Sequence, residues 1–138
     1  MRIRKAPPKL KGKPVRETLR TEIYKLVEEF LDAINAGNVE YLTRKFSLSP
    51  QVLDEIHEVI NVVPRHPGPK LGLAPYERAF EQGGRSRPSI EFFRMDDASS
   101  WGVECSLWMD GRESEFILHA VVTEGAEGLA LNYGYIGS

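Results

Sequence analysis

The sequence predicts an α+β domain in which three N-terminal helices pack on a curved, four-stranded antiparallel sheet at the C-terminus. Apolar residues recur every three or four positions through the first half of the chain, which is typical of amphipathic helices. In the second half, apolar and polar residues alternate on both sides of Asp110-Gly111, a dipeptide that favours the tight turn of a β-hairpin. Because the helices precede the strands, the two kinds of element are expected to form separate layers.

Three helices account for the first half of the chain. The apolar stripe of the first helix begins after Glu17 and ends at Gly37, a residue that favours the left-handed conformation closing a helix. Asn38 is placed to cap a short second helix, Val39–Phe46. The pair Ser49-Pro50 has the residue types that favour the N-cap and the first position of a third helix.

Strands account for most of the second half. Residues Pro64–Pro88 are predicted to be irregular, apart from a short helix over Pro75–Gln82, because Pro and Gly interrupt any longer element. On the last strand, alternation predicts that Tyr133 and Tyr135 share one face. Gly102 and Gly134 lie within predicted strands and predict a bend or a close approach there. The four predicted strands are Ser89–Met95, Trp101–Met109, Arg112–Thr123 and Leu129–Ile136.

The Asp110-Gly111 turn gives a predicted register for the central hairpin. With a two-residue loop, Met109 lies opposite Arg112, and each further step pairs one residue back with one residue on. The core face of this hairpin is then expected to carry Cys105, Phe116 and Leu118. The opposite face carries Glu104 opposite Ile117, Ser106 opposite Glu115, Trp108 opposite Glu113 and Gly102 opposite His119.

A basic segment precedes the helices. Residues 1–16 contain seven Lys or Arg and no Asp or Glu, which leaves 11 basic against 20 acidic side chains in the rest of the chain. We expect residues 1–16 to be a flexible arm and residues 17–138 a single domain. The arm either attaches to nucleic acid or an acidic partner, or is a solvated tail, one form of which folds back on its own acidic body. The absence of an aromatic residue for stacking on bases favours the second interpretation. Its basic side chains include Arg2, Arg4, Lys5, Lys9, Lys11 and Lys13.

Composition restricts the expected function. No apolar run approaches the roughly 20 residues of a spanning helix, and no apolar secretory segment is present, so no membrane partner is expected. The single cysteine, Cys105, is predicted to be a buried, reduced thiol, in keeping with a cytoplasmic location. His57, His66 and His119 lack the spacing of zinc ligands, and no phosphate loop or dinucleotide motif occurs. The sequence therefore predicts no metal and no cofactor.

The segment Leu26–Phe46, LVEEFLDAINAGNVEYLTRKF, resembles the opening helical pair of the nuclear transport factor 2-like superfamily. Members pair a long helix, ending in an apolar-x-x-Gly-(Asn/Asp) turn, with a short helix and a strongly curved sheet that forms a cone. The resemblance implies a cone-like fold, although no strand is evident here between the second and third helices. The hairpin around Trp101–Ser114 is also similar to small uncharacterised bacterial domains, some of which resemble immunity proteins.

The cone-fold resemblance implies one candidate acid–base site. Enzymes of this fold, such as steroid isomerases and polyketide cyclases, use a pocket carboxylate or His as base and a Tyr or protonated Asp to stabilise the enolate. The corresponding set here is His119, Glu104, Tyr133 and Tyr135, provided that the concave face carries them. The predicted register places His119 and Glu104 opposite the apolar face, which argues against catalysis.

A second candidate site is an interface around Trp108, with Glu113 and Ile117. Cone-fold proteins resemble one another in pairing through the outer or open face of the sheet, where a large aromatic residue anchors contacts. Cover of Trp108 by the arm or a loop is the alternative. We therefore expect a non-enzymatic protein-binding or accessory domain, of which an immunity-like protein is one form, that pairs with itself or another protein. The alternative is a small-molecule enzyme or ligand carrier with an enclosed, polar cone cavity.

Overall fold

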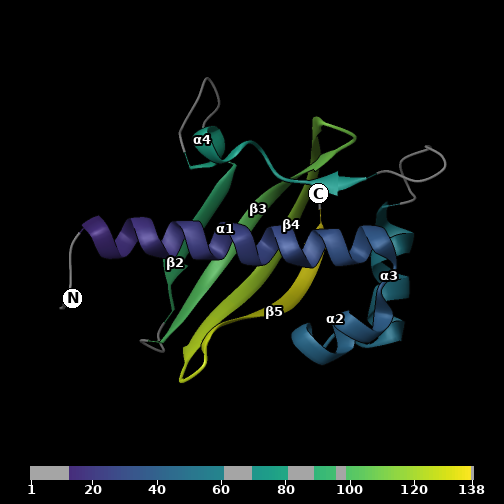
Figure 1. The fold of residues 1–138 in the computed structure, drawn as a ribbon. Coiled ribbons are helices and arrows are strands. Elements are labelled where there is room, and N and C mark those ends of the chain that lie inside the picture. The colour runs from purple at the N-terminus through teal and green to yellow at the C-terminus, as the bar shows by residue number, and fades with distance from the viewer. Residues whose placement is uncertain (1–12, 61–69, 81–88, 96–98, 138) are drawn as a thin grey trace.

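The computed structural model describes residues 13–60, 70–80, 89–95 and 99–137, with side chains from Thr18 onward. It confirms the α+β class: helices lie against one face of an antiparallel sheet that curls into a half-barrel (Figure 1). In chain order the elements are α1 (Lys13–Ala36), α2 (Val39–Phe46), α3 (Pro50–Ile60), β1 (Leu71–Gly72), α4 (Tyr76–Ala79), β2 (Ile90–Arg94), β3 (Ser100–Met109), β4 (Arg112–Gly125) and β5 (Gly128–Gly137).

The helix boundaries follow local residue chemistry. Gly37 adopts φ +66° after the last turn of α1, as predicted. The Asn38 side chain accepts a hydrogen bond of 3.2 Å from the backbone N–H of Tyr41 at the start of α2. The Ser49 hydroxyl accepts one of 3.2 Å from the Val52 N–H at the start of α3. These three helix boundaries are confirmed.

Helix α1 begins earlier than the sequence predicted. Its first residue is Lys13, so the last residues of the predicted arm belong to the helix. Pro14 is compatible with this start because a proline in the first turn removes an N–H that has no partner within the helix. None of the helices in the described ranges has the length and apolar composition of a membrane-spanning segment.

The sheet contains one more strand than predicted. Its order is β1-β3-β4-β5, and β2 pairs with β3 along the same edge as β1. Strand β1 is only two residues long, too short to give an alternating pattern. The Asn35 amide donates to the Leu71 carbonyl (2.8 Å) and accepts from the Leu71 N–H (2.9 Å). A side chain of α1 thus fixes β1 beside the helix.

The central hairpin turns where the sequence predicted. Asp110 and Gly111 have φ values of +53° and +83°, as a type I′ turn requires, and Met109 lies opposite Arg112. Trp108 also lies opposite Glu113, as predicted, but beyond this pair the predicted register is wrong by two residues. Ser106 lies opposite Ile117 instead of Glu115, and Glu104 lies opposite His119 instead of Ile117. The predicted pair of Gly102 with His119 is therefore also wrong, since Gly102 lies opposite Val121.

A bulge opposite Leu107 causes this shift. The Ser114 hydroxyl donates to the Leu107 carbonyl (2.7 Å) and accepts from the Phe116 N–H (3.1 Å), which satisfies backbone groups where the regular ladder is interrupted. Because the shift is an even number of residues, each side chain keeps its predicted face. Cys105, Phe116 and Leu118 are buried in the core, as predicted.

A second bulge separates two tyrosines that the sequence placed together. Between the pairs His119–Tyr135 and Ala120–Tyr133, strand β5 contains one extra residue, Gly134. A Cβ atom on Gly134 would lie 2.7 Å from the His119 carbonyl oxygen, so the close approach requires glycine. The shift of one residue turns Tyr133 inward and Tyr135 outward, and their predicted common face is therefore wrong.

The core fills the space between the helices and the inner face of the sheet. Every described helix contributes buried apolar side chains to one continuous cluster that packs against the inner face. The cluster includes Ile23, Val27 and Phe30 from α1, Leu42 and Phe46 from α2, Leu53, Ile56 and Ile60 from α3, Ala79 from α4, and Val103, Cys105, Leu118, Val122, Leu131 and Ile136 from the sheet.

Candidate interaction surface on the outer face of the sheet

The outer face of the sheet is the face turned away from the helical core. One row of side chains crosses four strands on this face. Glu91 on β2 lies opposite Glu104 on β3, and Glu104 lies opposite His119 on β4. His119 in turn lies opposite Tyr135 on β5. The two bulges create this row, because the first brings His119 to Glu104 and the second turns Tyr135 outward.

The centre of the row combines an aromatic stack with an ion pair. The His119 and Tyr135 rings are stacked, with centroids 4.2 Å apart and planes 11° apart. His119 Nδ1 lies 3.7 Å from Glu104 Oε2, which is too long for a hydrogen bond but close enough for attraction when the imidazole is protonated. These two side chains are 27% and 30% exposed, whereas Tyr135 is 57% exposed.

A second row beside it adds apolar surface. Phe93 on β2 lies opposite Gly102, and its ring covers that glycine so closely that a Cβ atom there would lie 2.5 Å from the ring. Phe93 nevertheless remains 50% exposed. Val121, opposite Gly102 on β4, is half-buried. We use the term outer-face patch for Phe93, Trp108, Ile117, His119, Val121 and Tyr135.

The predicted interface residues occupy one end of this patch. Trp108 lies opposite Glu113, as predicted, and Ile117 lies beyond the first bulge. Trp108 is half-buried and packs against the core cluster. Its indole Nε1 is buried and has no hydrogen-bond partner among the described residues. Trp108 therefore presents less free surface than Phe93 or Tyr135.

Phe93 and Tyr135 were not identified as interface residues from the sequence. Phe93 lies on a five-residue strand, where alternation gives a weak signal. Gly134 was expected to mark a bend or a close approach, and the structure confirms the close approach. Tyr135 was still assigned to the wrong face, because the sequence did not show that Gly134 is an extra residue in β5.

The structure brings together only part of the proposed acid–base set. Glu104, His119 and Tyr135 meet on the outer face, whereas Tyr133 lies on the inner side and stacks on Phe30 with centroids 5.9 Å apart. Burial raises the pKa of Tyr133, and a hydrogen bond from the Ile136 backbone amide partly offsets this effect. The condition on which the acid–base alternative depended, a concave face that carries all four side chains, is thus not met.

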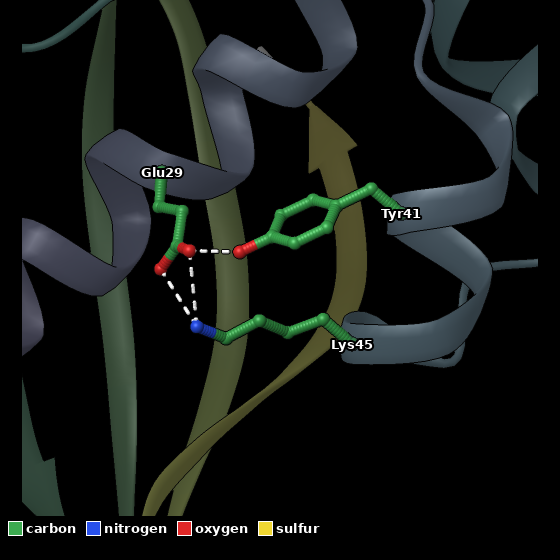
Figure 2. Close-up of polar contacts among 3 residues, drawn as sticks. All are labelled: Glu29, Tyr41 and Lys45. Atoms are coloured by element: carbon green, nitrogen blue, oxygen red, sulfur yellow. Dashed lines mark hydrogen bonds and ion pairs between the residues drawn. The ribbon is translucent and has the colours of Figure 1, made fainter.

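A shallow, open groove of about 460 Å³ lies between α1 and α2. Glu29 and Tyr41 line it, and a hydrogen bond runs from the Tyr41 hydroxyl to Glu29 (Figure 2). Lys45 Nζ lies 2.9 Å and 3.0 Å from the two carboxylate oxygens of Glu29. The Tyr41 hydrogen bond lowers the pKa of Glu29, Lys45 lowers it further, and partial burial opposes both. The hydrogen bond to Glu29 raises the pKa of Lys45.

Other candidate chemistry is limited. In the described ranges, no group of three or more His, Cys, Asp or Glu side chains could hold a metal ion. Burial raises the pKa of the Cys105 thiol to about 12, with a smaller effect from the charge of Glu104. Of the predicted arm, Lys13 is described only as backbone of α1. Arg2, Arg4, Lys5, Lys9 and Lys11 lie outside the described residues.

Residues 31–136 match a family described as a domain of unknown function, DUF7668. No curated protein and no solved structure matches the chain. The matched segment begins within α1 and includes the whole outer-face patch. It also includes α2 and every described strand up to Ile136 of β5.

Proposed function

The chain belongs to the DUF7668 family, and we propose that it is a non-enzymatic domain that binds another protein through the outer-face patch. The observation that carries the proposal is the exposure of large aromatic side chains on a sheet face. Phe93 and Tyr135 are half or more exposed, and on β4 the half-buried Val121 shares the row of Phe93 while the half-buried His119 shares the row of Tyr135. Large exposed aromatic side chains on one face of a sheet are typical of protein interaction sites, and aromatic residues frequently dominate their binding energy.

The charge around the patch indicates the chemistry of the partner. Glu91 and Glu104 lie side by side in the row that ends at Tyr135, and residues 17–138 carry 11 basic against 20 acidic side chains. A partner surface with apolar groups at its centre and Lys or Arg around them would complement this arrangement.

The enzyme alternative has less support. An acid–base enzyme of the cone type requires an enclosed cavity with polar groups pointing into it. Here Glu104 and His119 meet on the side of the sheet opposite the helices, while apolar side chains pack the inner face. Tyr133 is separated from the other three residues by the sheet itself.

The proposed superfamily, role and location of this protein each follow from features of its sequence. Membership of the nuclear transport factor 2-like superfamily is supported by the helix pair over Leu26–Phe46. An immunity-like role is supported by the resemblance of the hairpin around Trp101–Ser114 to small bacterial domains. A cytoplasmic location is supported by the single, buried cysteine.

The test is loss of a specific partner when aromatic surface is removed. Quantitative affinity capture from cells of the source organism, with wild-type protein and Phe93→Ala, should identify a protein enriched only by the wild type. With that protein purified, we expect Phe93→Ala and Tyr135→Ala each to weaken its dissociation constant by about 10- to 30-fold in calorimetry. Trp108→Ala should have a smaller effect on binding, because less of its surface is free.

Tyr76→Ala is the matched control. Tyr76 is also a large, exposed aromatic residue, but it lies on α4, where its ring contacts Tyr24 of α1. Its removal should leave the dissociation constant unchanged. Equal binding by wild type, Phe93→Ala and Tyr135→Ala, with circular dichroism showing that all are folded, would contradict the proposal.

A further inference from the structure

We propose that the free edge of β5 is a self-association surface, to which β5 of a second copy adds in antiparallel orientation to form a two-fold dimer. This edge is separate from the outer-face patch, and the inference does not depend on the proposed function. Among the strands that the structure describes, β5 is the last of the sheet and pairs with β4 alone (Figure 1).

The backbone of β5 offers unpaired hydrogen-bonding groups along this edge. The β4–β5 hairpin closes at Gly125 and Gly128 over a two-residue turn, so these two residues form a hydrogen-bonded pair. Alternation then directs the N–H and C=O groups of Leu129 and Leu131 away from β4. No described residue forms a hydrogen bond with these outward groups. A chain that exposes such a row is a template for another strand.

The opposite edge of the sheet is less suited to the addition of a strand. Strands β1 and β2 cover the edge of β3, and β1 is only two residues long. Strand β2 has five residues, among them Glu91 and Arg94, and charged residues on short edge strands oppose pairing. Strand β5 has ten residues and contains neither a charged residue nor a proline. Association through β5 alone therefore closes at two copies and does not extend into a filament.

The composition of β5 fits a second copy as its occupant. In an antiparallel pair centred on Leu131, Leu129 faces the copy's Tyr133 and Ala130 faces the copy's Asn132. No like charges oppose one another in this pairing, since the strand is uncharged. The formal net charge of the whole chain is only −2, so long-range repulsion between copies is weak.

The second bulge limits the length of the pairing segment. Gly134 interrupts the regular ladder, because β5 contains one extra residue at this point. The pairing segment is therefore residues 128–133. The exposed side chains of Ala130 and Asn132 lie at its centre, where a substitution reaches the interface without entering the core.

A charge-pair experiment tests the proposal. Light scattering of the wild type should give a mass twice the 15.6 kDa of one chain. The double variants Ala130→Lys/Asn132→Lys and Ala130→Glu/Asn132→Glu should each shift to the monomer mass, because like charges then face each other. Mixing the two variants should restore the dimer mass as a one-to-one heterodimer. The control Ala36→Lys/Gln51→Lys adds the same charge on exposed helix surfaces and should remain dimeric.

Amide hydrogen exchange gives a second readout that needs no substitution. Exchange at the Leu129 and Leu131 amides should slow as the concentration of wild-type protein rises, whereas exchange at the exposed turn residue Glu127 should not change. A monomer mass for the wild type at all concentrations overturns the proposal. A dimer that persists in both charge variants, or concentration-independent exchange at Leu129 and Leu131, also overturns it. Phe93→Ala should leave the dimer mass unchanged, which separates this result from the test of the outer-face patch.

Discussion

At the scale of single residues, the contact among Glu29, Tyr41 and Lys45 shows how polar side chains join two helices without forming a binding site. The two partners of Glu29 come from α2, which begins only three residues after α1 ends. The carboxylate therefore holds the angle between consecutive helices. All three side chains are partly exposed, so water screens the charges, and their contribution to stability is modest.

We predict that Glu29→Gln lowers the free energy of unfolding by about 0.5–1 kcal/mol near neutral pH. Glutamine can still accept the Tyr41 hydrogen bond but loses the ion pair. Because the folded-state pKa of Glu29 lies below its ordinary value of 4.5, its stabilising effect is present above that value and is lost as pH falls through the folded-state pKa. The raised pKa of Lys45 keeps that side chain charged throughout this range, since its contribution is lost only above its ordinary value of 10.5.

Urea unfolding of wild type and Glu29→Gln over a pH series provides the measurement. The difference in free energy should shrink as pH falls below 4.5. Glu22→Gln, an exposed change on the same helix, is the control for loss of one negative charge. A difference that stays constant from neutral to acidic pH would show that the ion pair is not the cause.

At the scale of elements, the two bulges determine which side chains meet. The second bulge depends on Gly134, where a side chain would collide with the backbone of β4. We predict that Gly134→Ala destabilises the fold by about 1–3 kcal/mol, because either β5 must move away or the backbone must strain. Gly72→Ala is the matched control, since a Cβ atom at Gly72 would meet nothing within 4 Å. Equal urea midpoints for the two variants would refute this explanation of the bulge.

The parts of the fold that depend on neighbouring residues in the sequence were predicted, whereas those that depend on contacts between strands were not. Gly37, Asn38 and Ser49 mark helix boundaries through their own backbone preferences or a hydrogen bond three residues away, and all three were predicted. The turn at Asp110-Gly111 was predicted for the same reason. The bulges were not, because they depend on contacts between strands: Ser114 with Leu107, and Gly134 with His119.

The candidate site was predicted in part for the same physical reason. The outward direction of Trp108, Glu104 and His119 follows from alternation, which a shift of two residues leaves intact. The outward direction of Tyr135 depends on a shift of one residue, which reverses alternation. The contact between Glu29 and Tyr41 joins two elements, and no periodicity within one helix reveals it.

At the scale of the whole molecule, the core extends beyond the segment that defines the family. The match begins at residue 31, whereas Ile23, Val27 and Phe30 are fully buried on the preceding turns of α1. Phe30 packs on Phe46 and Tyr133, from α2 and β5. The first part of α1 is thus an integral part of the domain.

Cys105 provides a probe of this global structure. It is the single cysteine, it is fully buried on β3, and burial raises its thiol pKa to about 12. We predict that iodoacetamide modifies it at least about 1,000-fold more slowly in the native protein than in the urea-denatured chain, because exposure requires global unfolding. Mass spectrometry over a urea series should show labelling that follows the unfolding transition. Rapid labelling well below that transition would indicate local opening of β3.

The bulge at Ser114 also has a consequence for how the chain folds. A hairpin that continues from the Asp110-Gly111 turn without a bulge keeps Cys105, Phe116 and Leu118 on the core face, so hydrophobic burial alone does not distinguish the two registers. The hydrogen bonds of the Ser114 hydroxyl and the pairing of Glu104 with His119 occur only in the native register. Polar contacts between β3 and β4, rather than burial of the core face, therefore select the native register of this hairpin.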